Sequence, residues 1–258
     1  MGAEQKQAIA EVFGRTASVY DEVIPFFGRF GELLVETAEV GAGEHVLDVA
    51  AGRGASARPA RDRVGPGGRV LAVDLAPEMV AILADAGVEA RVMDAEALDV
   101  PDDSFDVVLC GMAVMFFPDL PVACREWRRV LRPGGRVALS TFSGANEEMA
   151  SFVDVVRPFM ARATAPPPPP VPPPDVDGAL VGAGFSRVDH REVEATFVLP
   201  DEDAWWRWLW SQGQRVFLEV LPDDALEEVR AACVERLRPH RTPQGYALTQ
   251  CARITLAR

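Results

Sequence analysis

Three aspartates, spaced 20 to 26 residues apart, could bind a nucleoside. Asp48 lies in a buried-strand pattern, Asp74 ends the next apolar run, and Asp94 follows 20 residues later. A carboxylate has enough lone pairs to accept hydrogen bonds from both hydroxyls of a ribose diol. Gly52 and Gly54 allow backbone conformations closed to other residues, and the helix expected after them begins with unpaired N–H groups. The pattern predicts an anchor for a polar or anionic ligand group beside a ribose site.

The elements that must position these acids are strands of a parallel sheet. Apolar runs alternating with helical patterns predict strands at residues 46–49, 69–74, 90–93 and 104–110, with two more at 186–198 and 247–257. Residues 131–140 are predicted to form a turn that leads into a further strand, the fifth along the chain. In such βαβ sheets, ligands bind at the carboxyl ends of the strands. Asp48, Asp74, Asp94 and Cys110 fall at or near those ends. One strand-end acid is explained by a turn or a helix cap, but three in succession favour a ligand site.

Four ordered segments narrow the ligand class. The pattern Gly52-x-Gly54-x-x-Ala57 alone also fits a loose dinucleotide fingerprint, which leaves a nicotinamide-dependent oxidoreductase as an alternative. Together, however, residues 44–141 resemble the class I S-adenosylmethionine-dependent methyltransferases, most closely the ubiquinone/menaquinone-biosynthesis type, in the segments VLDVAAGRG, VLAVDLAPEMV, VMDAEALDVPDDSFDVVLC and EWRRVLRPGGRV. A relative that binds the cofactor without transferring a methyl group is a second alternative.

The resemblance implies an α/β fold with a doubly wound, mostly parallel seven-stranded sheet and helical lid insertions. The implied strand order is 3-2-1-4-5-7-6, with the last strand antiparallel. The resemblance also implies that S-adenosylmethionine is the cofactor, and it implies a role for each of several residues. Asp48, Ala50 and Gly52 would contact its amino-acid part, Gly54 would let the next helix approach, and Asp74 would hold the ribose. The other implied cofactor positions are Leu75 and Met79 beside the adenine, Asp94 at its exocyclic amine, Ala95 through its N–H, Cys110 at the fourth strand end, and Tyr20, in an Ala-x-x-Tyr-Asp segment, near the methionine end.

The expected acceptor pocket is apolar. Met115 and Phe116 follow the fourth strand, where relatives often carry a histidine pair, so the sequence favours an apolar or aromatic acceptor and assigns no catalytic base. Phe26 and Phe27 are further pocket candidates. So are Trp205 and Trp206, because four tryptophans within residues 205–210 cannot all share one helical stripe. A homodimer interface, or packing against the proline-rich segment, is the alternative role for these rings.

The pattern predicts five regions along the chain. Residues 1–40 form an N-terminal helical cap, 41–141 the cofactor-binding core, 142–174 an insertion with a proline-rich connector, 175–200 and 245–258 the rest of the core sheet, and 201–244 a helical lid insertion. Eight of the ten residues from Ala165 to Pro174 are proline, which predicts an extended, stiff spacer. Asp224-x-x-Glu227 predicts a capping box at the start of a lid helix.

The amino-acid composition of the chain limits the classes of molecule that it is expected to bind. The 39 acids against 26 bases give a formal charge of −13, which repels nucleic-acid backbones and anionic membrane surfaces. No apolar run is long enough to span a bilayer, and the four cysteines form no C-x-x-C pair that would indicate a metal site. We therefore expect a cytoplasmic enzyme that acts on a small molecule.

Overall fold

A single mixed sheet organises the chain. The computed structural model describes residues 2–17, 21, 23–143, 147–166, 173–211 and 214–258, so the predicted cofactor contact Tyr20 lies outside the described residues. The sheet has the order β3-β2-β1-β4-β5-β8-β6, and the short β7 pairs with β8. The strands are β1 His45–Val49, β2 Arg69–Asp74, β3 Glu89–Val92, β4 Phe105–Gly111, β5 Leu131–Phe142, β6 Val188–Leu199, β7 Arg241–Thr242 and β8 Gly245–Ala257.

This topology confirms the predicted fold. With the two-residue β7 set aside, β8 is the seventh strand, and the observed order is the predicted 3-2-1-4-5-7-6. Strands β1 to β5 pair in parallel, whereas β8 runs antiparallel to both β5 and β6. The strand order reverses between β1 and β4, which is where a parallel sheet opens a crevice for a ligand.

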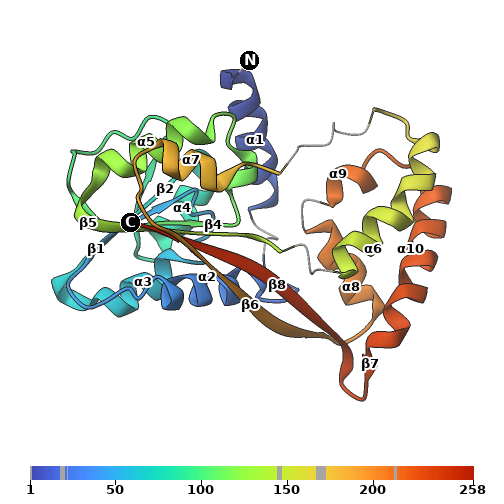
Figure 1. Cartoon of the computed structure of the whole chain (residues 1–258). Coiled ribbons are helices and arrows are strands. Elements are labelled where there is room, and N and C mark those ends of the chain that lie inside the picture. Colours follow the sequence, from blue (N-terminus) through green and yellow to red (C-terminus); the bar gives the residue numbers. More distant parts are fainter. Residues whose placement is uncertain (1, 18–20, 22, 144–146, 167–172, 212–213) are drawn as a thin grey trace.

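Helices cover both faces of the sheet (Figure 1). The α-helices are α1 Gly2–Thr16, α2 Phe26–Thr37, α3 Ala57–Val64, α4 Pro77–Asp85, α5 Leu120–Val130, α6 Glu147–Val156, α7 Val176–Gly182, α8 Glu202–Trp210, α9 Arg215–Leu218 and α10 Asp223–Leu237. Leu47 and Val49 of β1 pack in one core with α5 and α7, while Val46 packs in another with α2 and α3. The two cores follow from the alternation of side chains along a strand that is buried on both faces.

A group of four helices, which we call the helical lobe, lies apart from this core (Figure 1). It consists of α6, α8, α9 and α10, and the long strands β6 and β8 extend from the sheet towards it. The two strands stay paired over their whole length, from Val188 opposite Ala257 to Leu199 opposite Tyr246. The two insertions expected at 142–174 and 201–244 therefore build one structure.

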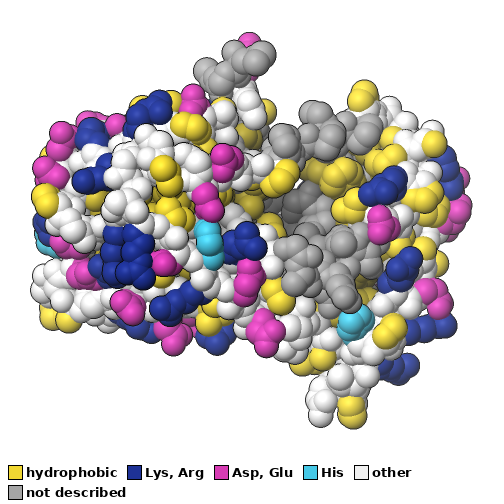
Figure 2. Space-filling view, viewed as in Figure 1, with side chains coloured by type: hydrophobic (Ala, Val, Ile, Leu, Met, Phe, Trp, Pro, Cys, Tyr) yellow, Lys and Arg dark blue, Asp and Glu magenta, His cyan; other side chains and the backbone are white. Residues whose placement is uncertain are grey.

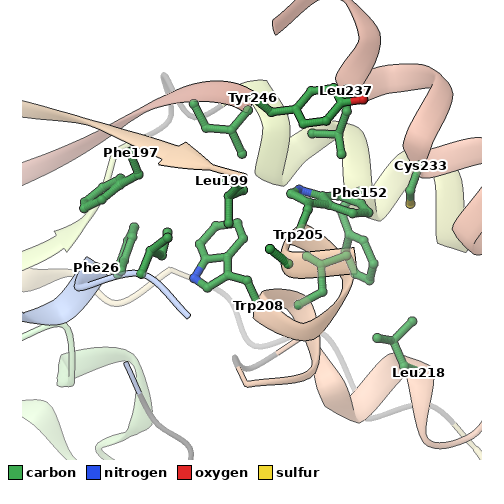
Figure 3. Packing of buried hydrophobic residues seen from close by; sticks show 14 of the residues in the cluster. Phe26, Phe152, Phe197, Leu199, Trp205, Trp208, Leu218, Cys233, Leu237 and Tyr246 are labelled. Atoms are coloured by element: carbon green, nitrogen blue, oxygen red, sulfur yellow. The ribbon is translucent and has the colours of Figure 1, made fainter. Parts of the chain in front are cut away.

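The helical lobe has its own hydrophobic core. Trp205, Trp208 and Leu218 are buried there, packed against residues of α10 and against Phe152 of α6 (Figure 3). The predicted capping box is wrong: α10 begins at Asp223, directly after Pro222, and no side chain caps its N-terminus. Within the described ranges, no helix has both the length and the apolar character needed to cross a membrane.

Candidate functional site

A cavity of about 460 Å³ opens at the carboxyl ends of β1, β2 and β4, beneath α1 and the start of α2. This volume is within the range of small-molecule and cofactor sites. Eight of the predicted cofactor residues line it: Ala50, Gly52, Gly54, Asp74, Leu75, Met79, Asp94 and Ala95. The sheet thus brings together residues that are spread over 46 positions of the sequence.

The turn after β1 forms the floor of the cavity. Ala50, Gly52 and Gly54 all have positive φ angles, of 53°, 54° and 85°. A Cβ atom on Gly54 would lie only 2.5 Å from Cδ2 of Leu83, so this glycine lets α4 pack closely against the turn. A Cβ atom on Gly52 would meet nothing within 4 Å, since this residue borders open space. At Gly52 the turn therefore presents bare backbone to the cavity.

Asp74 ties this turn to the end of β2. Its carboxylate accepts hydrogen bonds from the N–H of Gly52 at 2.8 Å and from the N–H of Ala76 at 2.9 Å. Burial raises the pKa of Asp74, while these backbone bonds act in the opposite direction. Because an ionised carboxylate has about four acceptor positions, Asp74 keeps capacity for two further donors.

Asp94 lies in the segment after β3 and has a partner that the sequence analysis missed. Its Oδ1 accepts from the N–H of Glu96 at 2.9 Å, and its Oδ2 lies 2.7 Å from Nζ of Lys6 on α1. The same ammonium group lies 2.5 Å from Glu96 Oε2. No motif surrounds Lys6, so residue spacing could not place it at the site.

Asp48 and Cys110 do not line this cavity. Asp48 is 1% exposed and faces a smaller space of about 20 Å³, together with Ser56 and Ser140, beneath the turn. Neither of its carboxylate oxygens has a partner with good hydrogen-bond geometry among the described residues. Burial raises the pKa of Asp48 to about 8, and only the backbone N–H of Ala57 opposes this rise. Cys110 lies in the core shared with α5, where burial raises the pKa of its thiol.

The predicted acceptor residues divide between two places. Phe27 and Phe116 line the cavity, whereas Met115 is not among its lining residues. Phe26, Trp205 and Trp206 belong instead to the helical-lobe core or pack against it. The reason is that α2 and the two insertions bury large side chains against one another. Phe13 of α1, with its ring 5.0 Å from that of Phe116, completes the apolar wall.

The histidines lie away from the cavity. His45 begins β1, at the opposite end of that strand from the cavity, and its ring contacts Arg132. His190 of β6 lies between Asp177 of α7 and Thr255 of β8, and His240 belongs to the short 3-10 helix Arg238–His240. The described lining residues include no histidine. The described residues also hold no group of three or more His, Cys, Asp or Glu that could bind a metal ion.

Comparisons with known proteins agree with this geometry. Residues 47–139 match the family model described as a methyltransferase domain. The chain is 34% identical over 253 residues to nocamycin O-methyltransferase of Saccharothrix syringae, an alignment that covers 89% of this chain and 90% of that protein. It is 32% identical over 171 residues to the ubiquinone/menaquinone biosynthesis C-methyltransferase UbiE of Hahella chejuensis, covering 61% and 69% of the two chains. The crystal structure of the YcgJ protein from Bacillus subtilis has the same fold, with a TM-score of 0.56 at 22% identity over 89% of this chain and 97% of that one.

Proposed function

Because the chain belongs to the family of S-adenosylmethionine-dependent methyltransferases, we propose that it methylates a carbon or an oxygen of a small, apolar or aromatic metabolite. The observation that carries the proposal is the cavity itself. Its floor combines the turn at Gly52 with the Asp74 carboxylate, and its wall is apolar at Phe13, Phe27 and Phe116. Similarity to an O-methyltransferase along nearly the whole chain favours oxygen as the methylated atom.

The residues present fit the cofactor. In our proposal Asp74 accepts from the two ribose hydroxyls, for which it has two acceptor positions left after bonding Gly52 and Ala76. Leu75 and Met79 flank the adenine, and Asp94 and the N–H of Ala95 contact its polar edge. Ala50 and Gly52 approach the methionine part through backbone, while Gly54 keeps α4 close to the turn.

Two predicted contacts take a different form in the proposal. Asp48 lies beneath the turn and acts through the smaller cavity, which shares Ala50, Ala51 and Gly111 with the larger one. Cys110 acts through packing only, since it lies in the core of the sheet.

The charge of the cavity favours a cationic cofactor. Its described lining residues include five carboxylates (Asp21, Glu32, Asp74, Asp94 and Glu96) against three cationic side chains (Lys6, Arg53 and Arg58). An excess of acid lowers the energy of a bound cation and raises that of a polyanion. A sulfonium cofactor fits this field better than a nicotinamide dinucleotide, whose pyrophosphate is negatively charged.

The proposed rate enhancement comes from orientation and water exclusion. The cofactor, when bound, supplies an electrophilic methyl group on a cationic sulfur. The chain supplies a rigid floor that fixes the cofactor, and the apolar side chains of Phe27 and Phe116, which hold an acceptor in line and keep water out. Since the described lining residues include no histidine, we assign no histidine as a general base.

We further propose that the acceptor is a free small molecule and that the enzyme acts in the cytoplasm. The face shown in Figure 2 carries acidic and basic side chains interspersed, without the continuous basic surface that a nucleic acid would need. The net charge of −13 and the four cysteines, none of which forms a disulfide in the part of the chain that the structure describes, are in keeping with these assignments. In the proposed division of the chain, residues 1–40 cover the cavity, and the helical lobe supports this cap from the other side.

A labelled-methyl assay tests the proposal. The protein is incubated with methyl-labelled S-adenosylmethionine and a panel of small aromatic and apolar hydroxy compounds, and labelled products are identified by mass spectrometry. We expect transfer to at least one oxygen or carbon acceptor, and calorimetric binding of S-adenosylhomocysteine but not of a nicotinamide dinucleotide. Binding of the dinucleotide alone would contradict the proposal.

A further inference from the structure

Lys6 is the only lysine in the chain; the other 25 basic residues are arginines. This one ammonium group lies at the rim of the cavity, where it pairs with Asp94 at 2.7 Å and with Glu96 at 2.5 Å. The side chains of Lys6, Glu96 and Asp94 are 20%, 11% and 32% exposed, so the cluster is partly buried and still reached by solvent. Bulk solvent therefore screens these pairs less than it screens a fully exposed pair such as Arg187–Asp189, whose side chains are 68% and 49% exposed.

Lys6 shares one face of α1 with the residues that pack it onto the core. Residues 6, 10, 13 and 17 follow the spacing of a helical stripe, and Ala10, Phe13 and Ala17 pack in a small cluster with Met79 of α4. Lys6 is the first residue of this stripe and makes an ion pair, whereas the residues that follow it in the stripe make apolar contacts. Through Ile9, Ala10 and Phe13, the same helix forms part of the cavity wall.

We propose that Lys6 is a latch that holds α1 closed over the cofactor, and that cofactor exchange requires the Lys6–Asp94–Glu96 cluster to open. This inference rests on the proposed function, since it takes Asp94 to lie at the adenine end of the cofactor site. Without the ammonium group, two carboxylates would face each other at the rim, and their repulsion would favour an open helix. Lys6 is accordingly a positioning residue: it acts on the cofactor through α1.

The Lys6 ammonium group stays charged near neutral pH. Burial alone would lower the pKa of Lys6, but its hydrogen bonds to Asp94 and Glu96 outweigh this effect, and its pKa is raised. A further charged group near α1 is Glu78 of α4, which approaches the helix at Gly14, two turns away from Lys6. High ionic strength is therefore a better means of opening the latch than an increase in pH.

The first test measures how fast S-adenosylhomocysteine leaves the full-length protein in stopped-flow displacement experiments. We expect Lys6→Met, which keeps the apolar stem, to raise the dissociation rate about tenfold, corresponding to about 1.4 kcal/mol. In the wild-type protein the rate should rise between about 0.1 M and 1 M salt, because the screening length falls from about 10 Å to about 3 Å. The rate of the variant should hardly depend on salt.

Arg15→Met is the matched control. It removes a charge of the same sign from the same helix, but Arg15 is exposed and does not line the cavity. We expect its dissociation rate to match that of the wild-type protein. Glu96→Gln should raise the rate in the wild-type background but add little in the Lys6→Met background, as expected for two groups that act as one pair.

A second test needs no cofactor. Because Lys6 is the sole lysine, acylation of its amine can be followed by mass spectrometry in one peptide, in which fragment ions separate it from acylation of the N-terminal amine. We expect the folded protein to react at least tenfold more slowly than the same chain in denaturant, and to lose this protection at high salt. An unprotected amine, or a Lys6→Met dissociation rate within twofold of wild type, would overturn the latch while leaving the methyltransferase proposal intact. If S-adenosylhomocysteine does not bind the wild-type protein, both proposals fail.

Discussion

Replacing Asp74 with alanine is the most direct test of the proposed cofactor orientation. The carboxylate has two acceptor positions left for ribose hydroxyls after it bonds the N–H groups of Gly52 and Ala76. A hydrogen bond to a charged group contributes about 1.5–3 kcal/mol. The loss of one such bond weakens binding about tenfold or more, and the loss of both about a hundredfold or more, since 1.4 kcal/mol is one decade. We expect Asp74→Ala to raise the dissociation constant of S-adenosylhomocysteine by at least tenfold.

The control must separate lost binding from lost stability. Asp106 of β4 is a suitable match because its carboxylate also accepts from a backbone N–H, that of His45 at 2.8 Å, and pairs with Arg132 away from the cavity. Each alanine variant leaves a backbone donor unpaired, which costs roughly 1–3 kcal/mol of stability. Only Asp74→Ala should change the calorimetric affinity. If the two variants unfold alike in urea and both bind the ligand as tightly as the wild-type protein, the ribose assignment is wrong.

Three further predictions follow from burial and position. Because burial raises the pKa of Asp48 to about 8, the folded protein holds a proton that the unfolded chain releases, so stability falls as pH rises from about 4 to about 8. Asp48→Asn should reduce this slope by up to about 1.4 kcal/mol per pH unit in urea titrations; parallel curves for the two proteins would refute the burial argument. Trp208→Ala should cost about 3–5 kcal/mol of stability, because its ring is buried in the helical lobe, yet a folded variant should keep the cofactor affinity. His45→Ala and His240→Ala should leave kcat nearly unchanged, whereas a loss of more than about 100-fold would identify a general base.

The sheet could be predicted from the sequence because each of its signals is local. A buried parallel strand needs only a short apolar run, and β1, β2 and β4 contain such runs between helical patterns, whereas β3 is a largely exposed edge strand. Asp74 is the last residue of β2, and Asp94 comes shortly after the end of β3. Because the two strands are parallel neighbours, both residues lie at the same edge of the sheet. Their positions in the cavity follow from topology and require no knowledge of side-chain packing.

The helical lobe could not be predicted in the same way. Its core joins Phe152, Leu199, Trp205 and Val229, which come from three helices and a strand end far apart in the sequence. Angular spacing on α8 correctly separates Trp206 from Trp208, but it cannot show what either ring meets. The sequence could not show that α6 packs against α10, because a contact between segments far apart in the chain leaves no periodic pattern of residues.

Two adjacent phenylalanines show how the helical lobe can matter to the cavity without lining it. Side chains of neighbouring residues on a helix point about 100° apart. At the start of α2, Phe26 enters the helical-lobe core (Figure 3), with its ring 5.9 Å from that of Trp208 and 5.6 Å from that of Phe197. The next residue, Phe27, lines the cavity. The two rings also contact each other, 5.0 Å apart. Packing in the helical lobe therefore fixes the rotation of α2, and this rotation sets the direction of Phe27 in the proposed acceptor wall.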